Sequence, residues 1–337
     1  MPIRDFTPSR ILLIRLARLG DVILLVSAIK LLRRKFPHSH IAVLAGQPCA
    51  PILEMCAAID EVISVDRVAM RDGNKFLAVR DILKLILQIR RANYELVIDF
   101  HGFRETNLLA WWSRAEWRLG LKRVHGAYLP FCFNLEPIVE DKTKHVAHVF
   151  RSLVTPLGID PYAEEIGLDL SADDLAKADS FLLRHGVPAQ ALILGFNVGA
   201  GSSGRIWPQR NFADLARRLI HQWGATVIFF SGPQDGGFSN EIADLTHDPR
   251  ALVAKNLPLR TLAALISRCK LFVSNDTGPM HLGPATGVPT LGLFSLGYPE
   301  HYRPLGTHNR FVQRNPIEHL QVGEVYEIVT EMMDMNH

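Results

Sequence analysis

The sequence predicts an α/β protein with two domains, each built around a parallel sheet. Short apolar runs alternate with longer amphipathic segments along the chain, a pattern typical of parallel sheets with covering helices. Two of the apolar runs, one near each end of the chain, stop at a turn that carries a carboxylate. With 337 residues, 48% of them hydrophobic and 21% charged, the chain can bury two ordinary cores.

The expected strands follow one another in order along both halves of the chain. In the first half the apolar runs are 10–15, 40–45, 61–66, 95–100 and 117–121. In the second half they are 191–197, 225–231, 251–254, 271–275 and 289–295. Helical patterns at 22–32, 75–92, 211–223 and 259–270 separate them. The stretch 155–174, which contains Pro156, Gly158 and Pro161, has a linker composition, so we predict domains at 1–165 and 166–337.

The segment that starts at Leu271 is the most informative in the chain. Its apolar run stops at Asp276, Thr277 and Gly278, and a short amphipathic segment over 281–286 follows at once. Open α/β sheets bind ligands where a strand opens into a helix, and the helix N-terminus suits a phosphate. A carboxylate beside such an anion site suits sugar hydroxyls, so the segment favours a nucleotide-sugar ligand. The alternative is that Asp276 only caps the helix.

A similar turn lies near the N-terminus. The run 10–15 leads through Gly20 and Asp21 into a segment of helical length, whose basic end at 33–35 suits a helix C-terminus. Two acidic turns in separate halves predict two domains that face a shared cleft.

Several other classes of protein do not fit the sequence. The longest apolar stretch, 22–32, is interrupted by Ser27 and Lys30, and no cleavable signal is evident at the N-terminus. The cysteines form no C-x-x-C pair and fit no zinc spacing, so we expect buried thiols in a reducing cytosol. The cysteines are Cys49, Cys56, Cys132 and Cys269. We also expect neither a metal nor a cofactor.

Charge is unevenly distributed. Residues 1–125 hold 20 Lys and Arg against 12 Asp and Glu, whereas the remainder holds 17 against 22. The basic half could bind nucleic acid, a membrane surface or a phosphorylated glycan. The alternative is a set of solvated helix faces and core tryptophans. The residues concerned are Trp111, Trp112 and Trp117 with Arg104, Arg114, Arg118, Lys122 and Arg123.

Three segments of the chain resemble, in their residues, order and spacing, glycosyltransferase family nine. The best-known members of that family are ADP-heptose:lipopolysaccharide heptosyltransferases. The three segments are residues 19–22 (Leu-Gly-Asp-Val), 205–208 (Arg-Ile-Trp-Pro) and 275–282. The resemblance runs from about Ile11 to Tyr302. It implies a GT-B fold with two Rossmann-like domains, the first binding the acceptor and the second the nucleotide-sugar. In such a fold the last helix could pack back on the first domain.

The resemblance also implies roles for individual residues. Asp21 matches the family's proposed catalytic base, with a simple helix cap as the alternative. Arg205 stands where family members often carry lysine, and its charge can neutralise the leaving diphosphate. The loop 197–204, with Ser202 and Ser203, can approach phosphates closely through its backbone.

The remaining predicted contacts are with the donor. Thr277, Gly278, Pro279 and His281 would neighbour the diphosphate, and Asp276 would contact the sugar hydroxyls. Gln234 or Asp235 would reach the ribose hydroxyls, as an acid does in relatives. Leu257 would lie near the adenine.

The resemblance implies an inverting transfer of heptose from ADP-heptose to the lipopolysaccharide inner core, with no metal ion and no nucleic acid involved. We expect a cytoplasmic protein that associates transiently with the inner membrane, and we expect Arg118 and Lys122 to grip the acidic acceptor. Alternatives are the same fold with another nucleotide-sugar or glycan acceptor, a non-catalytic nucleotide-binding protein, or a Rossmann oxidoreductase. No G-x-G-x-x-G follows the first strand, which argues against the oxidoreductase.

Overall fold

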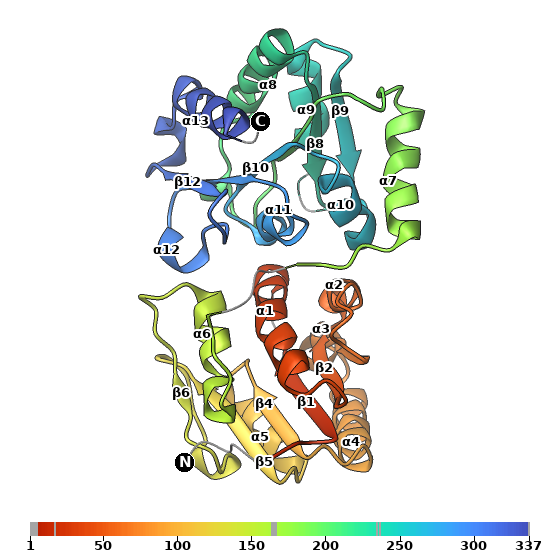
Figure 1. The fold of residues 1–337 in the computed structure, drawn as a ribbon, viewed down its shortest axis with the longest axis vertical. Helices are drawn as coiled ribbons and strands as arrows, with labels where there is room; N and C mark the ends of the chain where they lie inside the picture. The colour runs from red at the N-terminus through yellow and green to blue at the C-terminus, as the bar shows by residue number, and fades with distance from the viewer. Residues whose placement is uncertain (1–5, 17, 163–166, 234, 236, 336–337) are drawn as a thin grey trace. The chain divides into compact units, whose positions relative to one another are not determined.

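The computed structural model describes residues 6–16, 18–162, 167–233, 235 and 237–335. The chain forms two compact units, Met1–Glu165 and Ile166–His337, and the division falls within the stretch 155–174 whose composition predicts a linker. Each unit contains one six-stranded sheet with helices packed against it (Figure 1).

The first sheet is parallel and has the strand order β3-β2-β1-β4-β5-β6. All five strands predicted in this half are confirmed, but the edge strand β6 was not predicted, because two residues are too few to show a period. The strands are β1 (Arg10–Arg15), β2 (His40–Gly46), β3 (Glu61–Val65), β4 (Leu96–Asp99), β5 (Trp117–Lys122) and β6 (Ile138–Val139).

Helices cover both faces of this sheet. Leu12 and Ile14 of β1 share a core with Leu85 of α4 and Leu109 of α5. The alternate residues of β1 point to the opposite face and are also fully buried, and on that face α1 and α6 pack against each other (Figure 1). The helices are α1 (Leu19–Lys35), α2 (Ala50–Leu53), α3 (Arg67–Asp72), α4 (Lys75–Arg91), α5 (Arg104–Trp112) and α6 (Val146–Ser152).

The second sheet is also parallel, with the order β12-β11-β10-β7-β8-β9. Counted from its own first strand, it repeats the order of the first sheet, and both have the Rossmann arrangement. The predicted strands are confirmed and one more, β12, completes the sheet. The strands are β7 (Ile193–Asn197), β8 (Thr226–Ser231), β9 (Ala251–Lys255), β10 (Leu271–Asn275), β11 (Thr290–Phe294) and β12 (Arg310–Gln313).

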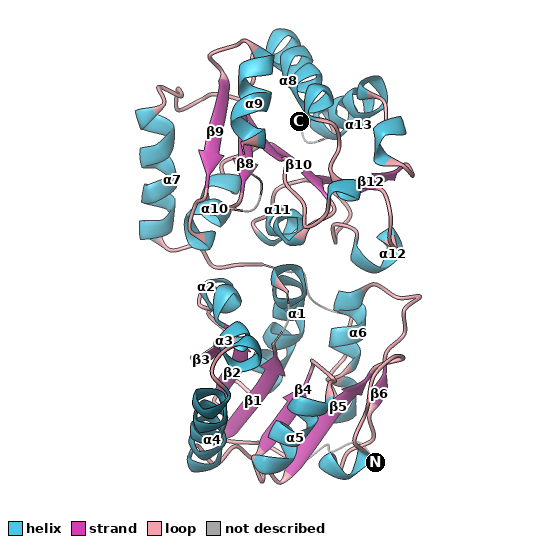
Figure 2. Cartoon of the chain, turned by 180° about the vertical axis from the view of Figure 1, so that it is seen from behind, coloured by secondary structure: helices cyan, strands magenta, loops and turns pink. Residues whose placement is uncertain are grey.

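The last helix is part of the second unit. Helix α13 packs against α8, and its Val325, Val329 and Met332 belong to the core that Phe196 and Phe212 share (Figure 2). These apolar residues of α13 are thus buried within the second unit. The helices are α7 (Ala172–Arg184), α8 (Gln209–Trp223), α9 (Phe238–Thr246), α10 (Leu259–Ile266), α11 (Leu282–Ala285), α12 (Pro299–Tyr302) and α13 (Val322–Asp334). In the ranges described, no helix combines the length and the apolar composition needed to cross a membrane.

Candidate active site

In each sheet the first three strands are added toward one edge and the next three toward the other edge. The order therefore reverses at one switch point. In the first unit this switch point lies between β1 and β4, and in the second between β7 and β10. Ligands of doubly wound sheets bind outside the carboxyl ends of the strands at such a point, because the two flanking loops diverge there. Asp21 follows β1 and Asp276 follows β10, so both predicted acids lie at a switch point.

Asp21 is held by a buried arginine. Its Oδ2 atom lies 2.9 Å from Nη2 of Arg15, whose side chain is 2% exposed against 13% for that of Asp21. The residue at the N-cap of α1 is Arg18, and Asp21 lies inside the first turn. Asp21 is therefore not the N-cap residue itself, and its ion-pair partner is Arg15.

Arg15 is itself fixed to two other elements. Its Nη1 donates to the carbonyl oxygen of Phe100, directly after β4, at 2.7 Å, and its guanidinium lies 4.8 Å from the ring centroid of Phe150 on α6. Arg15 therefore connects Asp21 to the far side of the switch point. Sequence reasoning missed this role, although an arginine that ends a buried strand was a visible signal.

The turn after β4 brings a neutral histidine to the same edge. Asp99 is fully buried and accepts hydrogen bonds from the backbone N–H groups of His101 and Gly102 and from Nδ2 of Asn107, at 2.8 to 3.0 Å. Burial raises the pKa of Asp99, and these donors oppose the rise. Gly102 has a φ of 71°, which lets the chain turn sharply here.

His101 was not predicted as a site residue. It is 3% exposed, and neither ring nitrogen has a hydrogen-bond partner among the described residues. Burial, followed by the charges of Arg15, Arg67 and Arg123, lowers its pKa to about 3. The imidazole is thus neutral near pH 7, and one nitrogen can accept and the other can donate.

Three arginines surround His101, and two of them are paired with carboxylates: Arg15 with Asp21 at 2.9 Å and Arg123 with Glu140 at 3.0 Å. Arg67 donates to the carbonyl oxygen of Leu16, and Nε of Arg123 donates to that of His101 at 2.7 Å. Arg118, which the charge pattern suggested as an acceptor contact, is instead half-buried, with its Nε 2.9 Å from the carbonyl oxygen of Cys132. Its guanidinium is thus occupied in holding its own unit together.

Cys49 is the cysteine next to the predicted base. Burial, followed by the negative charge of Asp21, raises the pKa of its thiol to about 11. It is buried, as are Cys56, Cys132 and Cys269. A thiol with such a pKa is not a nucleophile near pH 7.

In the second unit Arg205 and Asp276 form an ion pair. The Nη1 atom of Arg205 lies 3.1 Å from Oδ2 of Asp276, and the two side chains are 39% and 14% exposed. Burial raises the pKa of the Asp276 carboxyl, while the Arg205 charge opposes that rise. The two residues are 71 positions apart in the chain, so this contact is a product of the fold.

The loop that carries Arg205 is held in place by Asn275, the last residue of β10. Its Nδ2 donates to the carbonyl oxygen of Val198 at 2.8 Å, and its Oδ1 accepts from the backbone N–H of Trp207 at 3.1 Å. One buried amide thus clamps both ends of the loop. Ser202 and Ser203 lie exposed at the tip of this loop, where the short 3-10 helix Ser203–Arg205 begins.

The segment after Asp276 differs from the predicted helix. It is a 3-10 helix, Gly278–His281, followed by the single-turn α11, Leu282–Ala285. Proline residues at 279 and 284 and glycine at 283 disfavour a longer regular helix. So short a helix has a weak dipole, so its N-terminus offers little positive charge compared with the guanidinium of Arg205. Thr277 is at the N-cap, Pro279 follows Gly278, and His281 is buried.

Asp235 lies against the same loop. Its Oδ2 accepts from the backbone N–H of Gly232, and a Cβ atom placed on Gly199 would lie 2.1 Å from that oxygen. Only glycine fits at position 199 while Asp235 keeps this position. Gln234 lies outside the described residues.

Leu257 and the loop after β11 lie at the carboxyl ends of the strands, on opposite sides of the switch point between β7 and β10. Leu257 is half-buried and follows β9, two strands beyond β7. On the other side, Gly297 has a φ of 116°, and a Cβ there would lie 3.8 Å from Oδ2 of Asp276. Sequence reasoning missed this third loop, because a Ser-Leu-Gly-Tyr run has no distinctive pattern.

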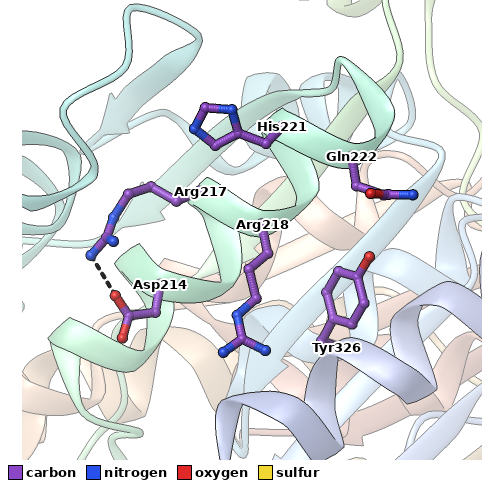
Figure 3. Close-up of a pocket in the computed structure, with 6 residues that line it drawn as sticks. All are labelled: Asp214, Arg217, Arg218, His221, Gln222 and Tyr326. Atoms are coloured by element: carbon purple, nitrogen blue, oxygen red, sulfur yellow. Dashed lines mark hydrogen bonds and ion pairs between the residues drawn. The ribbon is translucent and has the colours of Figure 1, made fainter.

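A separate surface hollow lies between α8 and α13. It measures about 590 Å³ and is lined by Asp214, Arg217, Arg218, His221, Gln222 and Tyr326. Figure 3 shows these side chains along the two helices, with Asp214 paired to Arg217. None of the predicted site residues lines it. Within the described ranges, no group of three or more His, Cys, Asp and Glu residues could hold a metal ion.

Comparison with known proteins places the chain among glycosyltransferases. The family model "Glycosyltransferase family 9 (heptosyltransferase)" matches residues 82–324. The chain is 21% identical over 301 residues to the lipopolysaccharide core heptosyltransferase OpsX of Haemophilus influenzae, covering 89% of this chain and 82% of the relative. It is 25% identical over 316 residues to lipopolysaccharide heptosyltransferase 2 of Escherichia coli K12, covering 90% and 88%.

Solved structures agree with this assignment. A family 9 glycosyl transferase from Veillonella parvula superposes with a TM-score of 0.86 at 25% identity, covering 99% of both chains. Escherichia coli ADP-heptose heptosyltransferase II superposes with a TM-score of 0.80 at 21% identity, covering 97% of this chain and 99% of the other. The predicted GT-B fold is confirmed. With two Rossmann-type sheets, an acid at each switch point and a family model that matches more than half of its length, the chain belongs to glycosyltransferase family 9.

Proposed function

We propose that the protein transfers heptose from ADP-heptose to the inner core of lipopolysaccharide, with inversion at the anomeric carbon. The observation that carries this proposal is the Arg205–Asp276 pair at the β7/β10 switch point. A cation and a carboxylate side by side suit a ligand with a diphosphate next to a polyhydroxylated sugar.

The donor would lie along the carboxyl edge of the second sheet. Neighbouring strands are about 4.8 Å apart, so the strands β10, β7, β8 and β9 present successive contacts along one extended ligand. In this order Asp276 meets the sugar, Arg205 with Ser202 and Ser203 meets the diphosphate, Asp235 meets the ribose, and Leu257 meets the adenine. Thr277, Gly278, Pro279 and His281 would lie beside the diphosphate.

Donor binding would divide the ion pair between two parts of the ligand. Arg205 is partly exposed and can turn its guanidinium to the phosphates, where it opposes the charge that develops as ADP leaves. Asp276, no longer paired, then accepts hydrogen bonds from sugar hydroxyls. Asn275 keeps the loop in position during this exchange through its bonds to both loop ends.

Asp21 would act as the base for the acceptor hydroxyl. The hydroxyl oxygen bonds to the anomeric carbon, the bond from that carbon to the ADP oxygen breaks, and the hydroxyl proton passes to Asp21. Attack from the face opposite ADP inverts the configuration. Arg15 would hold the carboxylate in position, and the exposed Arg67 would attract the acidic groups of an inner-core acceptor.

The relatives support the choice of substrates. The two compared above have names that specify lipopolysaccharide heptosyltransferases. Escherichia coli heptosyltransferase WaaC, solved with ADP and with ADP-2-deoxy-2-fluoro heptose, superposes with TM-scores of 0.78 and 0.76 at 19% and 20% identity. An acceptor that is built in the cytoplasmic leaflet implies a cytoplasmic protein that associates transiently with the inner membrane.

A panel of ADP-, UDP-, GDP- and dTDP-sugars tests the donor. A ligand that binds only the native state raises the melting temperature, by the equivalent of about 2.7 kcal/mol at 100 times its Kd. We expect ADP-heptose to give the largest shift and to support transfer to a heptose-deficient inner-core acceptor. A larger shift with another nucleotide-sugar, together with transfer of that sugar, would replace heptose as the donor. Binding without transfer to any acceptor would favour a nucleotide-binding protein.

A further inference from the structure

Helix α4 has two apolar faces, and only one of them is used in folding. Ala78, Leu85 and Ile89 are buried, and the last two pack into the core of the first unit. Two more large apolar residues of this helix, Leu77 and Ile82, are 46% and 37% exposed and lie to either side of a more exposed set. The members of this set are between 49% and 81% exposed and are Phe76, Val79, Leu83 and Leu87.

These four residues form one stripe. They are spaced by three, four and four positions, so they lie on one side of an α-helix. At 100° per residue this stripe lies well away from the face centred on Leu85 and Ile89. Val68 of the adjacent helix α3 is exposed as well, and α3 packs against α4. Contiguous apolar surface of this kind marks an interaction site.

Basic residues border the stripe. The helical period places Arg80, Lys84 and Arg91 along one side of it and Lys75 along the other, and all four are exposed. The single acid of α4, Asp81, pairs with Arg80 at 3.0 Å. The surface therefore combines apolar side chains with an excess of positive charge, the pattern of a helix that lies in the surface of an anionic membrane.

We propose that α4 is the membrane-docking surface of this protein. Phe76, Val79, Leu83 and Leu87 enter the boundary between headgroups and acyl chains, and Lys75, Arg80, Lys84 and Arg91 contact anionic headgroups. This proposal rests on the proposed function, because an acceptor embedded in a bilayer requires the enzyme at that surface. It also gives the positive charge of residues 1–125 a defined location.

A second copy of the chain fits this surface less well. Two α4 stripes packed together would bring the flanking arginines and lysines of both copies close, and like charges across an interface are unfavourable. An anionic bilayer offers both an apolar layer and the opposite charge. The buried face of α4 keeps the helix attached to the sheet during docking, because Leu85 and Ile89 stay in the core.

Vesicle co-sedimentation of the purified full-length protein, without substrates, tests the proposal. Vesicles of phosphatidylcholine alone are compared with vesicles that also contain phosphatidylglycerol. We expect binding to the anionic vesicles and a loss of at least about tenfold in the partition coefficient for Phe76→Ser/Leu83→Ser. Arg80→Glu/Lys84→Glu should lose at least about tenfold on anionic vesicles. These positions are exposed, so the melting temperature should change little.

Matched variants provide the control. Leu183→Ser/Leu245→Ser removes two exposed leucines of the second unit, and Lys142→Glu/Lys255→Glu reverses two exposed lysines. Both should bind vesicles like the unmodified protein. An equal loss in the controls, or binding unaffected by the α4 variants, would overturn the proposal. So would sedimentation of a dimer that Phe76→Ser/Leu83→Ser converts to monomers, which would make α4 a self-association surface.

Transfer to a delipidated inner-core oligosaccharide separates this proposal from the proposed function. The α4 variants should keep normal transfer in solution and lose transfer only to acceptor in anionic vesicles. If they transfer to both acceptors equally well, the docking surface is wrong and the enzyme assignment stands. Vesicle binding that depends on α4, with no heptose transfer under either condition, would leave the docking surface standing and overturn the assigned reaction.

Discussion

The Nη1 atom of Arg205 lies 3.1 Å from Oδ2 of Asp276 at the switch point of the second sheet. Burial raises the pKa of Asp276, and Arg205 opposes the rise, so each residue stabilises the other while no ligand separates them. A donor that engages both must replace this contact with two new ones.

Separate substitution of the two residues should therefore give different losses. Asp276→Ala should weaken binding of ADP-heptose far more than binding of ADP, because its proposed partner is the sugar. Arg205→Ala should lower kcat about 10²- to 10³-fold, and Arg205→Lys should recover part of that loss by restoring the charge. Calorimetric titration with both ligands and steady-state kinetics measure these effects. Equal losses of ADP and ADP-heptose binding in Asp276→Ala would assign the carboxylate to the nucleotide or to the fold.

The Arg15–Asp21 pair leads to a prediction about the base. Asp21→Asn and Asp21→Ala should lower transfer by about two to four orders of magnitude and leave donor binding nearly unchanged. Arg15→Met should lower kcat more than it raises KM, because the carboxylate loses its orientation, and Arg15→Lys should restore part of kcat. Near-normal turnover in Asp21→Asn would show that the residue only supports the helix.

His101 should make stability depend on pH. Its pKa is lowered to about 3 in the folded protein, from 6.5 for an ordinary histidine. The unfolded chain therefore binds more protons between these values, so the contribution of His101 is fully present above pH 6.5 and is lost as the pH falls toward 3.

Urea denaturation at pH 7 and pH 5 measures this effect. Between these values His101 should lower the free energy of unfolding by up to about 2 kcal/mol. His101→Gln, which cannot titrate, should show a smaller drop by about that amount. Identical drops in both proteins would mean that the imidazole is protonated in the folded state.

Gly199 and Asp235 should be coupled. A Cβ at position 199 would lie 2.1 Å from Oδ2 of Asp235, so Gly199→Ala must displace the carboxylate and should cost about 1–3 kcal/mol of stability. In an Asp235→Ala background the same substitution should cost much less. A double-mutant cycle by urea denaturation provides the test, and additive costs would show that the two residues do not meet.

Activity should persist in excess EDTA. The proposed leaving-group site relies on Arg205 and the backbone of its loop, and the described residues include no cluster of three or more His, Cys, Asp and Glu suited to an ion. Transfer assays with EDTA, and with Mg²⁺ added back, test this account. A complete loss that Mg²⁺ reverses would contradict it.

Local patterns in the sequence were sufficient to predict most of the strands. Continuous apolar runs identify strands buried on both faces, so all ten predicted strands are present. The two strands that were missed, β6 and β12, are short edge strands with partly exposed residues. The turns after β1 and β10 could be predicted because acidic residues, hydroxyl side chains and glycine follow the apolar runs there.

Only the tertiary structure determined which side chains meet. Arg15 and Asp21 are close in sequence, but the bond from Arg15 to Phe100 joins distant segments, as do the contacts of Arg205 with Asp276 and of Asn275 with Val198. The order of strands in the sheet sets these distances, and one sequence does not reveal that order by periodicity. The same holds for α4, whose period predicts a helix but not which of its two apolar faces the core buries. The sequence by itself therefore determined the elements and the chemistry available at each strand end, and packing determined the pairs, because contacts between distant segments depend on the whole fold.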